Sequence, residues 1–347
     1  MMIREAIAHL AAGATLSTEE AAASMEEIMT GTATPSQVGA FLMALRMRPG
    51  AETVEEVAGL AQVMRAKAVQ VHLNESTAAR AMDTCGTGGD GSGSLNISTA
   101  AGIIAAAAGA TIAKHGNRSA SSKCGSADVL EALGVKIDLG PEALAQSIEE
   151  CGFGFMFAQT YHPAMRYVGP TRREIGVRTV FNILGPLTNP ANIPYQVLGV
   201  PDRSLLRKMG EALLLLGCRH ALVIHSEDGL DECSLGAPTY ICEVTRGQEL
   251  REYSITPEEV GLTRTSDTTY FQGGNPAHNA QVLREVLASY IVTPVTEMIC
   301  LNTAAALMAN EQVASFKDGV KLARATLQEG KAKRKLAEII ECSQTYK

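Results

Sequence analysis

Residues 81–119 read AMDTCGTGGDGSGSLNISTAAGIIAAAAGATIAKHGNRS, and this stretch decides the fold class. Its Ala-rich run over residues 101–108 predicts a helix, and residues 111–113 predict the strand that follows. Two polar loops flank this helix and strand, and each loop follows the end of a strand. Such alternation of strands, Gly-rich turns and helices is typical of a largely parallel sheet covered by helices.

The same alternation continues toward the C-terminus. Short apolar runs predict strands at 135–137, 197–200 and 221–224, and helical spacing predicts helices at 127–133 and 205–216. These elements extend the α/β part of the chain well beyond the opening stretch.

The first 70 or so residues show helical spacing instead. Three capping boxes, in which a hydroxyl residue precedes Glu or Gln by three positions, begin at Ser17, Thr34 and Thr53. Apolar residues recur at helical spacing behind each box. We therefore predict an α/β protein with a small all-α N-terminal domain and a larger α/β domain with a mainly parallel sheet. The first comprises residues 1–72 plus about 170–187, and the second residues 73–169 and 188–347.

Composition excludes several classes of protein. The net charge of −7 argues against nucleic-acid or membrane affinity, and the longest low-polarity run, 100–113, is too short to cross a bilayer. The first residues carry an acid where a signal peptide has a basic segment. Eight scattered cysteines without a C-x-x-C pair favour reduced thiols and exclude a zinc site. We expect a cytoplasmic protein.

The first polar loop is rich in glycine, with Gly86, Gly88, Gly89 and Gly91 closely spaced. Glycine allows positive φ and close approach of the backbone to a ligand. Asn96, Ser98 and Thr99 then stand at a helix start, where unpaired N–H groups and the helix dipole favour an anion. The loop lacks both the Walker motif and a clean G-x-G-x-x-G. It indicates either a phosphate site or an ordinary Gly-rich turn with a helix cap.

The second polar loop, residues 114–128, is rich in hydrogen-bond donors. It occupies the position, outside a strand end, where open α/β sheets bind ligands. Lys114 suits a point-charge contact with phosphate, and Arg118 suits further oxygens. His115 is a general base, or a histidine that lines the site or supports the fold. Two such loops on successive strand ends predict a substrate with two phosphate-bearing ends.

Asp231 and Glu232 form an acidic pair just after the strand predicted at 221–224. Adjacent carboxylates on a loop point in different directions, which suits two Mg²⁺ ions better than one chelate. Magnesium completes its shell with water and substrate phosphates, so here it would neutralise a pyrophosphate leaving group. An exposed acidic loop is the alternative.

A basic segment follows His162-Pro163 and contains Arg172, Arg173 and Arg178. A guanidinium that faces the Gly-rich loops would form a bidentate clamp for a carboxylate substrate. The pattern alone does not choose among the three arginines.

In this order, GTGGD (86–90), NIST (96–99), KHGNR (114–118), GPLTNP (185–190) and the acidic pair closely resemble the anthranilate phosphoribosyltransferase family. The resemblance spans nearly the whole chain. It implies a fold shared with nucleoside phosphorylases, a homodimer and Mg²⁺ at about two ions per subunit. It also implies transfer of the phosphoribosyl group of phosphoribosyl pyrophosphate (PRPP) to the amine of anthranilate in tryptophan biosynthesis. Ser94 and Leu95 depart mildly from the Thr and aromatic residue more common in the family.

The resemblance also implies a role for each matching residue. PRPP would be held by Gly86, Gly89, Asp90, Ser94, Asn96, Ile97, Ser98, Thr99, Lys114, His115, Gly116, Asn117, Arg118, Ser119, Ala120, Ser121, Ser122 and Ser126. Anthranilate would contact Gly86, Asn117, His115, His162, Pro163 and Arg172. Mg²⁺ would be bound by Ser98, Asp231 and Glu232. No side chain is expected to act as a general acid or base, because the aromatic amine already carries a lone pair.

Two other functions are compatible with parts of the pattern. A pyrimidine nucleoside phosphorylase is similar in fold, but it binds free phosphate and needs no acidic pair for a metal; Asn117 with Arg172 also favours the transferase. A non-enzymatic nucleic-acid-binding relative should show a basic face and eroded motifs. The acidic charge and intact motifs of this chain disfavour that relative.

Overall fold

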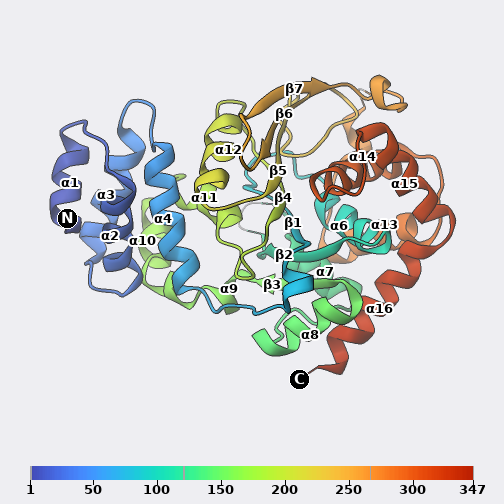
Figure 1. Cartoon of the computed structure of the whole chain (residues 1–347), viewed down its shortest axis with the longest axis horizontal. Helices are drawn as coiled ribbons and strands as arrows, with labels where there is room; N and C mark the ends of the chain where they lie inside the picture. Colours follow the sequence, from blue (N-terminus) through green and yellow to red (C-terminus); the bar gives the residue numbers. More distant parts are fainter. Residues whose placement is uncertain (1, 120–121, 266, 347) are drawn as a thin grey trace.

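Four helices at the N-terminus form a bundle at one end of the molecule. The computed structural model, which describes residues 2–119, 122–265 and 267–346, places them as α1 (Ile3–Ala11), α2 (Thr18–Met29), α3 (Pro35–Met47) and α4 (Val54–Lys67). The bundle is blue in Figure 1. All three predicted capping boxes are confirmed: Ser17, Thr34 and Thr53 accept hydrogen bonds from the backbone N–H of Glu20, Gln37 and Glu56.

A later segment of the chain packs back against this bundle. It contains η1 (Pro163–Tyr167), α10 (Gly169–Ile175), α11 (Phe181–Leu184) and η2 (Gly185–Leu187). Helix α10 contacts α3, and α11 contacts α4. Val180 and Leu184 share one buried apolar core with Phe41 and Leu60. Figure 1 shows α10 beside the blue helices although it lies far from them in sequence.

A seven-stranded sheet forms the centre of the molecule, in the order β3-β2-β1-β4-β5-β6-β7. The strands are β1 (Ala81–Gly86), β2 (Thr111–Gly116), β3 (Phe153–Phe157), β4 (Tyr195–Gly199), β5 (His220–Ser226), β6 (Thr239–Thr245) and β7 (Arg251–Ile255). The strands from β3 to β5 in this order pair in parallel, whereas β6 and β7 are antiparallel. The predicted mainly parallel sheet is confirmed.

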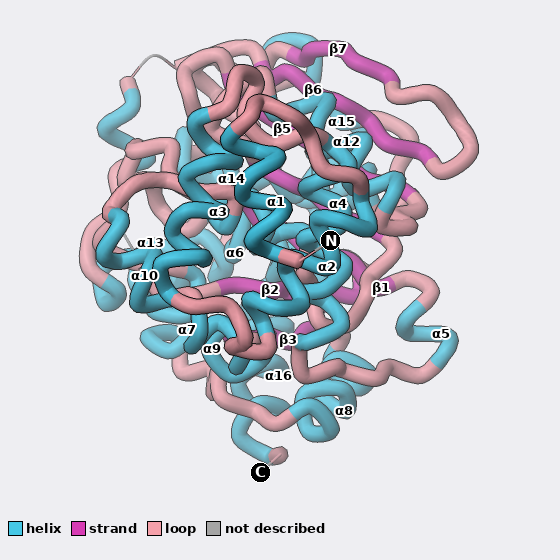
Figure 2. The backbone as a smooth tube through the Cα atoms, turned by 90° about the vertical axis from the view of Figure 1, so that its left-hand side faces the viewer, coloured by secondary structure: helices cyan, strands magenta, loops and turns pink. Residues whose placement is uncertain are grey.

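Helices cover both faces of the sheet (Figure 1). Two groups of helices, given below, cover the two faces, and each group shares a core with the sheet. Leu222 and Ile224 of β5 belong to the core with the first group, and Ala221 and Val223 belong to the core with the second. The alternation reflects the two-residue period of a strand. The first group is α6 (Ile97–Ala107), α7 (Ser126–Leu133), α13 (Pro276–Ala288), α14 (Pro294–Ala309), α15 (Phe316–Gln328) and α16 (Lys331–Thr345). The second is α12 (Leu205–Leu215) and the bundle, which lies in front of the strands in Figure 2.

Shorter elements complete the chain. Helices α8 (Pro141–Cys151) and α9 (Ala158–Tyr161) flank β3, and α5 (Glu75–Ala78) precedes β1. Two 3₁₀ helices, η3 (Glu258–Val260) and η4 (Thr268–Phe271), follow β7. No helix in the described ranges is long and apolar enough to cross a membrane. None of the eight cysteines, all of which lie in the described ranges, forms a disulfide in this structure.

The strand predicted at 135–137 is wrong. Gly134 ends α7 with φ +97°, and the N–H of Lys136 donates to Ser343 Oγ in α16. Val135 and Ile137 are buried, but they belong to the core that α16 completes. The position beside β2 is taken by β3 instead, which sequence reasoning missed.

Candidate functional site

The carboxyl ends of β1, β2, β4 and β5 meet at one edge of the sheet, because these strands are parallel. A small cleft opens at this edge. It is lined by Thr84, Cys85, Gly86, Ser98, Ala101, Val197, Gly199, Ile224, Asp231, Glu232 and Asn302. The Gly-rich loop and the acidic pair, predicted separately from sequence, therefore lie at one cleft.

Two glycines at strand ends make room for the acidic loop. A Cβ atom at Gly86 would lie 2.4 Å from Asp231 Oδ2, and one at Gly199 would lie 1.7 Å from the carbonyl oxygen of Asp231. Both distances are shorter than any real side chain allows, so only glycine lets the loop pack this closely against β1 and β4.

The acidic pair is hydrogen-bonded to the first polar loop. Asp231 Oδ2 accepts from the N–H of Gly88 at 3.0 Å, and Glu232 Oε1 accepts from the N–H of Ser98 at 3.2 Å. The other oxygen of Glu232, Oε2, is buried and has no hydrogen-bond partner among the residues that the structure describes. The alternative of an exposed acidic loop is excluded by this burial.

Burial also changes the protonation of both carboxyl groups. It raises the pKa of Asp231 to about 6, with a further contribution from the nearby charge of Asp90, while Arg178 opposes the rise. It raises the pKa of Glu232 well above the ordinary value, and the charge of Asp231 adds to this. Two partly buried acidic groups, one with a buried and unpartnered oxygen, fit a hard divalent cation, which would stabilise the charged carboxylates. The hydroxyl residue Ser98 stands beside them.

Asn96 caps α6 and links the two polar loops. Its Nδ2 donates to the carbonyl oxygen of Cys124, and its Oδ1 accepts from Asn279 of α13. Ile97 and Thr99 are fully buried, so Asn96 and Ser98 form the accessible surface at the start of this helix. The helix start lies at the cleft, but the unpaired N–H groups expected there are taken within the protein: Ile97 donates to Leu95, Ser98 to Glu232, and Thr99 and Ala100 to Asn96.

The rest of the first loop is held by local contacts. Asp90 accepts hydrogen bonds from the N–H and the hydroxyl of Ser92. Ser94 forms an isolated bridge with Gln272, just before α13. Gly89 has φ +81°, and its carbonyl oxygen accepts from Arg178.

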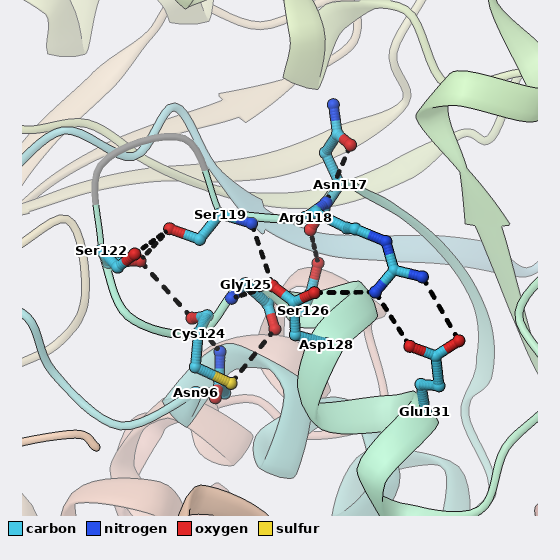
Figure 3. A network of polar contacts seen from close by, with 10 residues as sticks. All are labelled: Asn96, Asn117, Arg118, Ser119, Ser122, Cys124, Gly125, Ser126, Asp128 and Glu131. Carbon is cyan, nitrogen blue, oxygen red and sulfur yellow. Dashed lines mark hydrogen bonds and ion pairs between the residues drawn. The ribbon is translucent and has the colours of Figure 1, made fainter. Parts of the chain in front are cut away.

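The second polar loop is held by α7 (Figure 3). Asp128 accepts from the N–H groups of Ser119 and Gly125, and also from Arg118. Arg118 forms a second ion pair with Glu131, so its guanidinium faces α7. Ser126 Oγ donates to the carbonyl oxygen of Asn117, the residue after the end of β2 at Gly116. The hydroxyl groups of Ser119 and Ser122 are hydrogen-bonded to each other. Ala120 and Ser121 lie outside the described residues.

Lys114 lies beneath the two loops. Its side chain is buried, and its ammonium group donates to the carbonyl oxygen of Thr84. The ammonium stabilises the charged form of Asp83, although burial dominates and raises the pKa of that carboxyl group. The contact with phosphate predicted for Lys114 therefore requires its side chain to leave Thr84.

Two histidines meet beside the second loop. His115 Nε2 lies 3.2 Å from Nε2 of His162, the residue that precedes Pro163. Burial lowers the pKa of His115 to about 3 and that of His162 to about 4. Both imidazoles are neutral at pH 7, and a group with a pKa near 3 is a weak base.

The structure distinguishes Arg172, Arg173 and Arg178, among which the sequence pattern alone did not choose. The guanidinium of Arg172 is half-buried, stacks 5.2 Å from the ring centroid of Phe181, and has no carboxylate partner in residues 2–119, 122–265 and 267–346. Arg173 is exposed on the same helix. Arg178 donates to the Gly-rich loop. Of the three, Arg172 is thus the half-buried one, whereas Arg173 and Arg178 are exposed.

Two buried asparagines were missed by sequence reasoning. Asn302 of α14 clamps the residue after the acidic pair: its Oδ1 accepts from the N–H of Cys233 and its Nδ2 donates to the carbonyl oxygen of Cys233. Asn189 donates to Asp83 Oδ2 and to the carbonyl oxygen of Ala113, which ties β1 to β2. A lone amide inside an otherwise apolar helix was the available signal for Asn302.

Comparisons with known proteins agree along the whole chain. Residues 4–68 match the helical bundle domain of a glycosyl transferase family, and residues 78–333 match its a/b domain. Anthranilate phosphoribosyltransferase from Roseiflexus sp. (strain RS-1) is 50% identical over 99% of this chain and 98% of its own length. The one from Chloroflexus aggregans is also 50% identical, over 99% of both chains.

Solved structures give the same result. The crystal structure of anthranilate phosphoribosyltransferase from Thermus thermophilus has a TM-score of 0.90 at 42% identity, over 98% of this chain and 99% of that one. The enzyme from Saccharomyces cerevisiae in complex with PRPP and Mg has a TM-score of 0.89 at 25% identity, over 99% of this chain and 98% of that one. Full-length agreement in sequence and fold shows that this chain belongs to the anthranilate phosphoribosyltransferase family.

Proposed function

We propose that this chain transfers the phosphoribosyl group of PRPP to the amine of anthranilate and releases pyrophosphate, a step of tryptophan biosynthesis. The observation that carries this proposal is the junction of the acidic pair with the Gly-rich loop through the N–H groups of Gly88 and Ser98. The backbone of the Gly-rich loop and two partly buried carboxyl groups lie at one cleft, which supports the binding of a diphosphate ester with its metal ions there.

The reaction breaks the bond between C1 of the ribose and the pyrophosphate oxygen while the amine attacks C1. Positive charge develops on the sugar and negative charge on the leaving group, so positioning and charge neutralisation supply the catalysis. Glycine N–H groups at 86–91 and the start of α6 would hold the phosphates. Lys114 would add a positive charge on moving from Thr84, and the charge of Arg118 would add to it from the second loop.

Asp231 and Glu232, with the hydroxyl of Ser98, would hold Mg²⁺ at about two ions per subunit. When bound, the ions would supply Lewis-acid neutralisation of the pyrophosphate oxygens. The partial burial of both residues and the buried, unpartnered Oε2 of Glu232 support this assignment.

Anthranilate would lie between the second loop and α10. Arg172 would bind its carboxylate, and Asn117 would contact it from the end of β2. His115, His162 and Pro163 would line its path, with both imidazoles neutral. We also propose that the enzyme is a homodimer and acts in the cytoplasm.

The proposed function is tested by the loss of anthranilate fluorescence in the presence of PRPP and Mg²⁺. The chain contains no Trp, so protein emission interferes little. We expect turnover only with all three components, and none when PRPP is replaced by inorganic phosphate and a pyrimidine nucleoside. Turnover of the nucleoside, or none with PRPP, anthranilate and Mg²⁺ together, would refute the proposal.

A further inference from the structure

Arg178 connects two segments that the proposed function assigns to different substrates. Its Nη1 donates to the carbonyl oxygen of Gly89 at 3.0 Å, and its Nη2 donates to that of Gly88 at 3.3 Å. These are two positive-φ glycines of the loop proposed to hold PRPP. The arginine itself follows α10, the helix that carries Arg172.

Gly88 is held from both sides. Its N–H donates to Asp231 at 3.0 Å, and its carbonyl oxygen accepts from Arg178 at 3.3 Å. The peptide groups around Gly88 are thereby fixed between the acidic pair and the segment that returns to the bundle. Fixing both ends of a flexible glycine reduces the conformational freedom that ligand binding would otherwise have to remove.

The space at Gly89 is matched to the guanidinium. A Cβ atom at Gly89 would lie 1.6 Å from Nη1 of Arg178, so the close approach exists only because residue 89 has no side chain. In the same part of the chain, the guanidinium of Arg172 stacks on Phe181 of α11. Arg172, Arg178 and Phe181 thus belong to one short segment that runs from α10 to α11.

From this arrangement we infer that Arg178 is a positioning residue that couples the two substrate sites. By tying the Gly-rich loop to the segment that carries Arg172, it makes occupation of the loop by a diphosphate favour the arrangement that binds anthranilate. Because coupling between two sites is reciprocal in free energy, bound anthranilate should favour diphosphate binding equally. The inference rests on the proposed function for the identity of the two ligands.

The coupling can be measured without turnover by using Mg²⁺ and inorganic pyrophosphate as the probe for the loop. Anthranilate fluorescence would give its Kd with and without the probe in the wild type, Arg178→Ala, Arg178→Gln and the control Arg173→Ala. We expect the probe to tighten anthranilate binding by about tenfold in the wild type and the control. In Arg178→Ala the tightening should fall to about twofold or less, with the Kd for anthranilate alone nearly unchanged.

Arg178→Gln keeps hydrogen-bond donors and should restore part of the tightening, which a purely structural defect would not do. Full tightening in a folded Arg178→Ala enzyme would overturn the inference, and so would its absence in the wild type. Turnover of the wild type in the fluorescence assay tests the proposed function separately, so the two failures are distinguishable.

Discussion

At the scale of single residues, the paired imidazoles of His115 and His162 make stability depend on pH. Burial lowers their pKa values to about 3 and about 4, below the ordinary value of 6.5. The unfolded chain therefore binds more protons than the folded one between those values and pH 6.5. By linkage, stability is fully present above pH 6.5 and is lost as the pH falls.

We predict that replacing His162 with Asn flattens this dependence. Each buried neutral histidine contributes about 2 kcal/mol of stability that disappears between about pH 7.5 and pH 5. Urea unfolding at both pH values should show a loss for the wild type that exceeds the loss for the variant by about that amount. Equal losses would mean that the imidazole of His162 charges freely in the folded protein.

Replacing Arg172 should raise the KM for anthranilate more than the KM for PRPP. Its guanidinium is half-buried and has no carboxylate partner among the described residues, so its replacement by Ala would remove the contact that we propose with the carboxylate of anthranilate. We expect the KM for anthranilate to rise roughly 10- to 100-fold, with a smaller change in the KM for PRPP. Arg173→Ala, on the exposed side of α10, serves as the control. Equal effects on both substrates would contradict a selective clamp.

The types of the site residues were predictable, but their contacts were not. The glycines, the helix-start residues and the acidic pair follow from local chemistry, and the structure gathers them at one edge. That Lys114 reaches Thr84, and that Arg118 turns to Asp128 and Glu131, depends on distances set by packing. No local pattern contains that information.

At the scale of elements, α14 supports the acidic pair through a single side chain. Asn302 accepts from and donates to the backbone of Cys233, directly after Glu232. Replacing Asn302 with Ala leaves two buried backbone groups without partners and should lower the free energy of unfolding by about 3 kcal/mol. The Mg²⁺ concentration for half-maximal activity should rise about tenfold, because outer contacts orient metal ligands.

The control for this effect is Asn310→Ala at the C-terminal end of the same helix, where the side chain bonds to Arg80 and Gln312, away from the acidic pair. It should leave the Mg²⁺ titration unchanged. An Asn302→Ala enzyme with a normal Mg²⁺ titration would show that the position of the acidic pair does not depend on α14.

The elements differ in how well sequence predicts them. Helix starts at Ser17, Thr34 and Thr53 were predictable because a capping box satisfies the first N–H groups locally. The strand predicted at residues 135–137 was wrong because so short an apolar segment fits a strand and a buried loop equally well. A contact with α16 decides for the loop, because Ser343, 207 residues away in sequence, accepts a hydrogen bond from the N–H of Lys136.

At the scale of the whole molecule, the chain leaves the helical bundle and forms strands β1 to β3. It then returns to the bundle through α10 and α11, and afterwards forms strands β4 to β7. The return, through α10 and α11, brings Arg178 to the Gly-rich loop that follows β1. We assigned residues of about 170–187 to the helical domain from the sequence, and α10 and α11 do pack against the bundle. The alignment of this segment with the Gly-rich loop was not predictable, because the order of strands in the sheet decides which loops meet.

Ligand binding should therefore stabilise the molecule as a whole. We predict that PRPP with Mg²⁺ at about 100 times its Kd raises the free energy of unfolding by about 2.7 kcal/mol. The double variant Asp231→Asn with Glu232→Gln should lose most of this gain in thermal unfolding, since it keeps the shape of the loop but removes both charges. Undiminished stabilisation in that variant would place the metal elsewhere.

The most direct measurement is a crystal structure of the enzyme with PRPP and Mg²⁺ bound. We predict phosphate oxygens against the N–H groups of residues 86–91 and the start of α6, with Mg²⁺ between them and the carboxylates of Asp231 and Glu232. PRPP bound away from the ends of β1 and β2, or magnesium without a contact to either carboxylate, would contradict the proposed site.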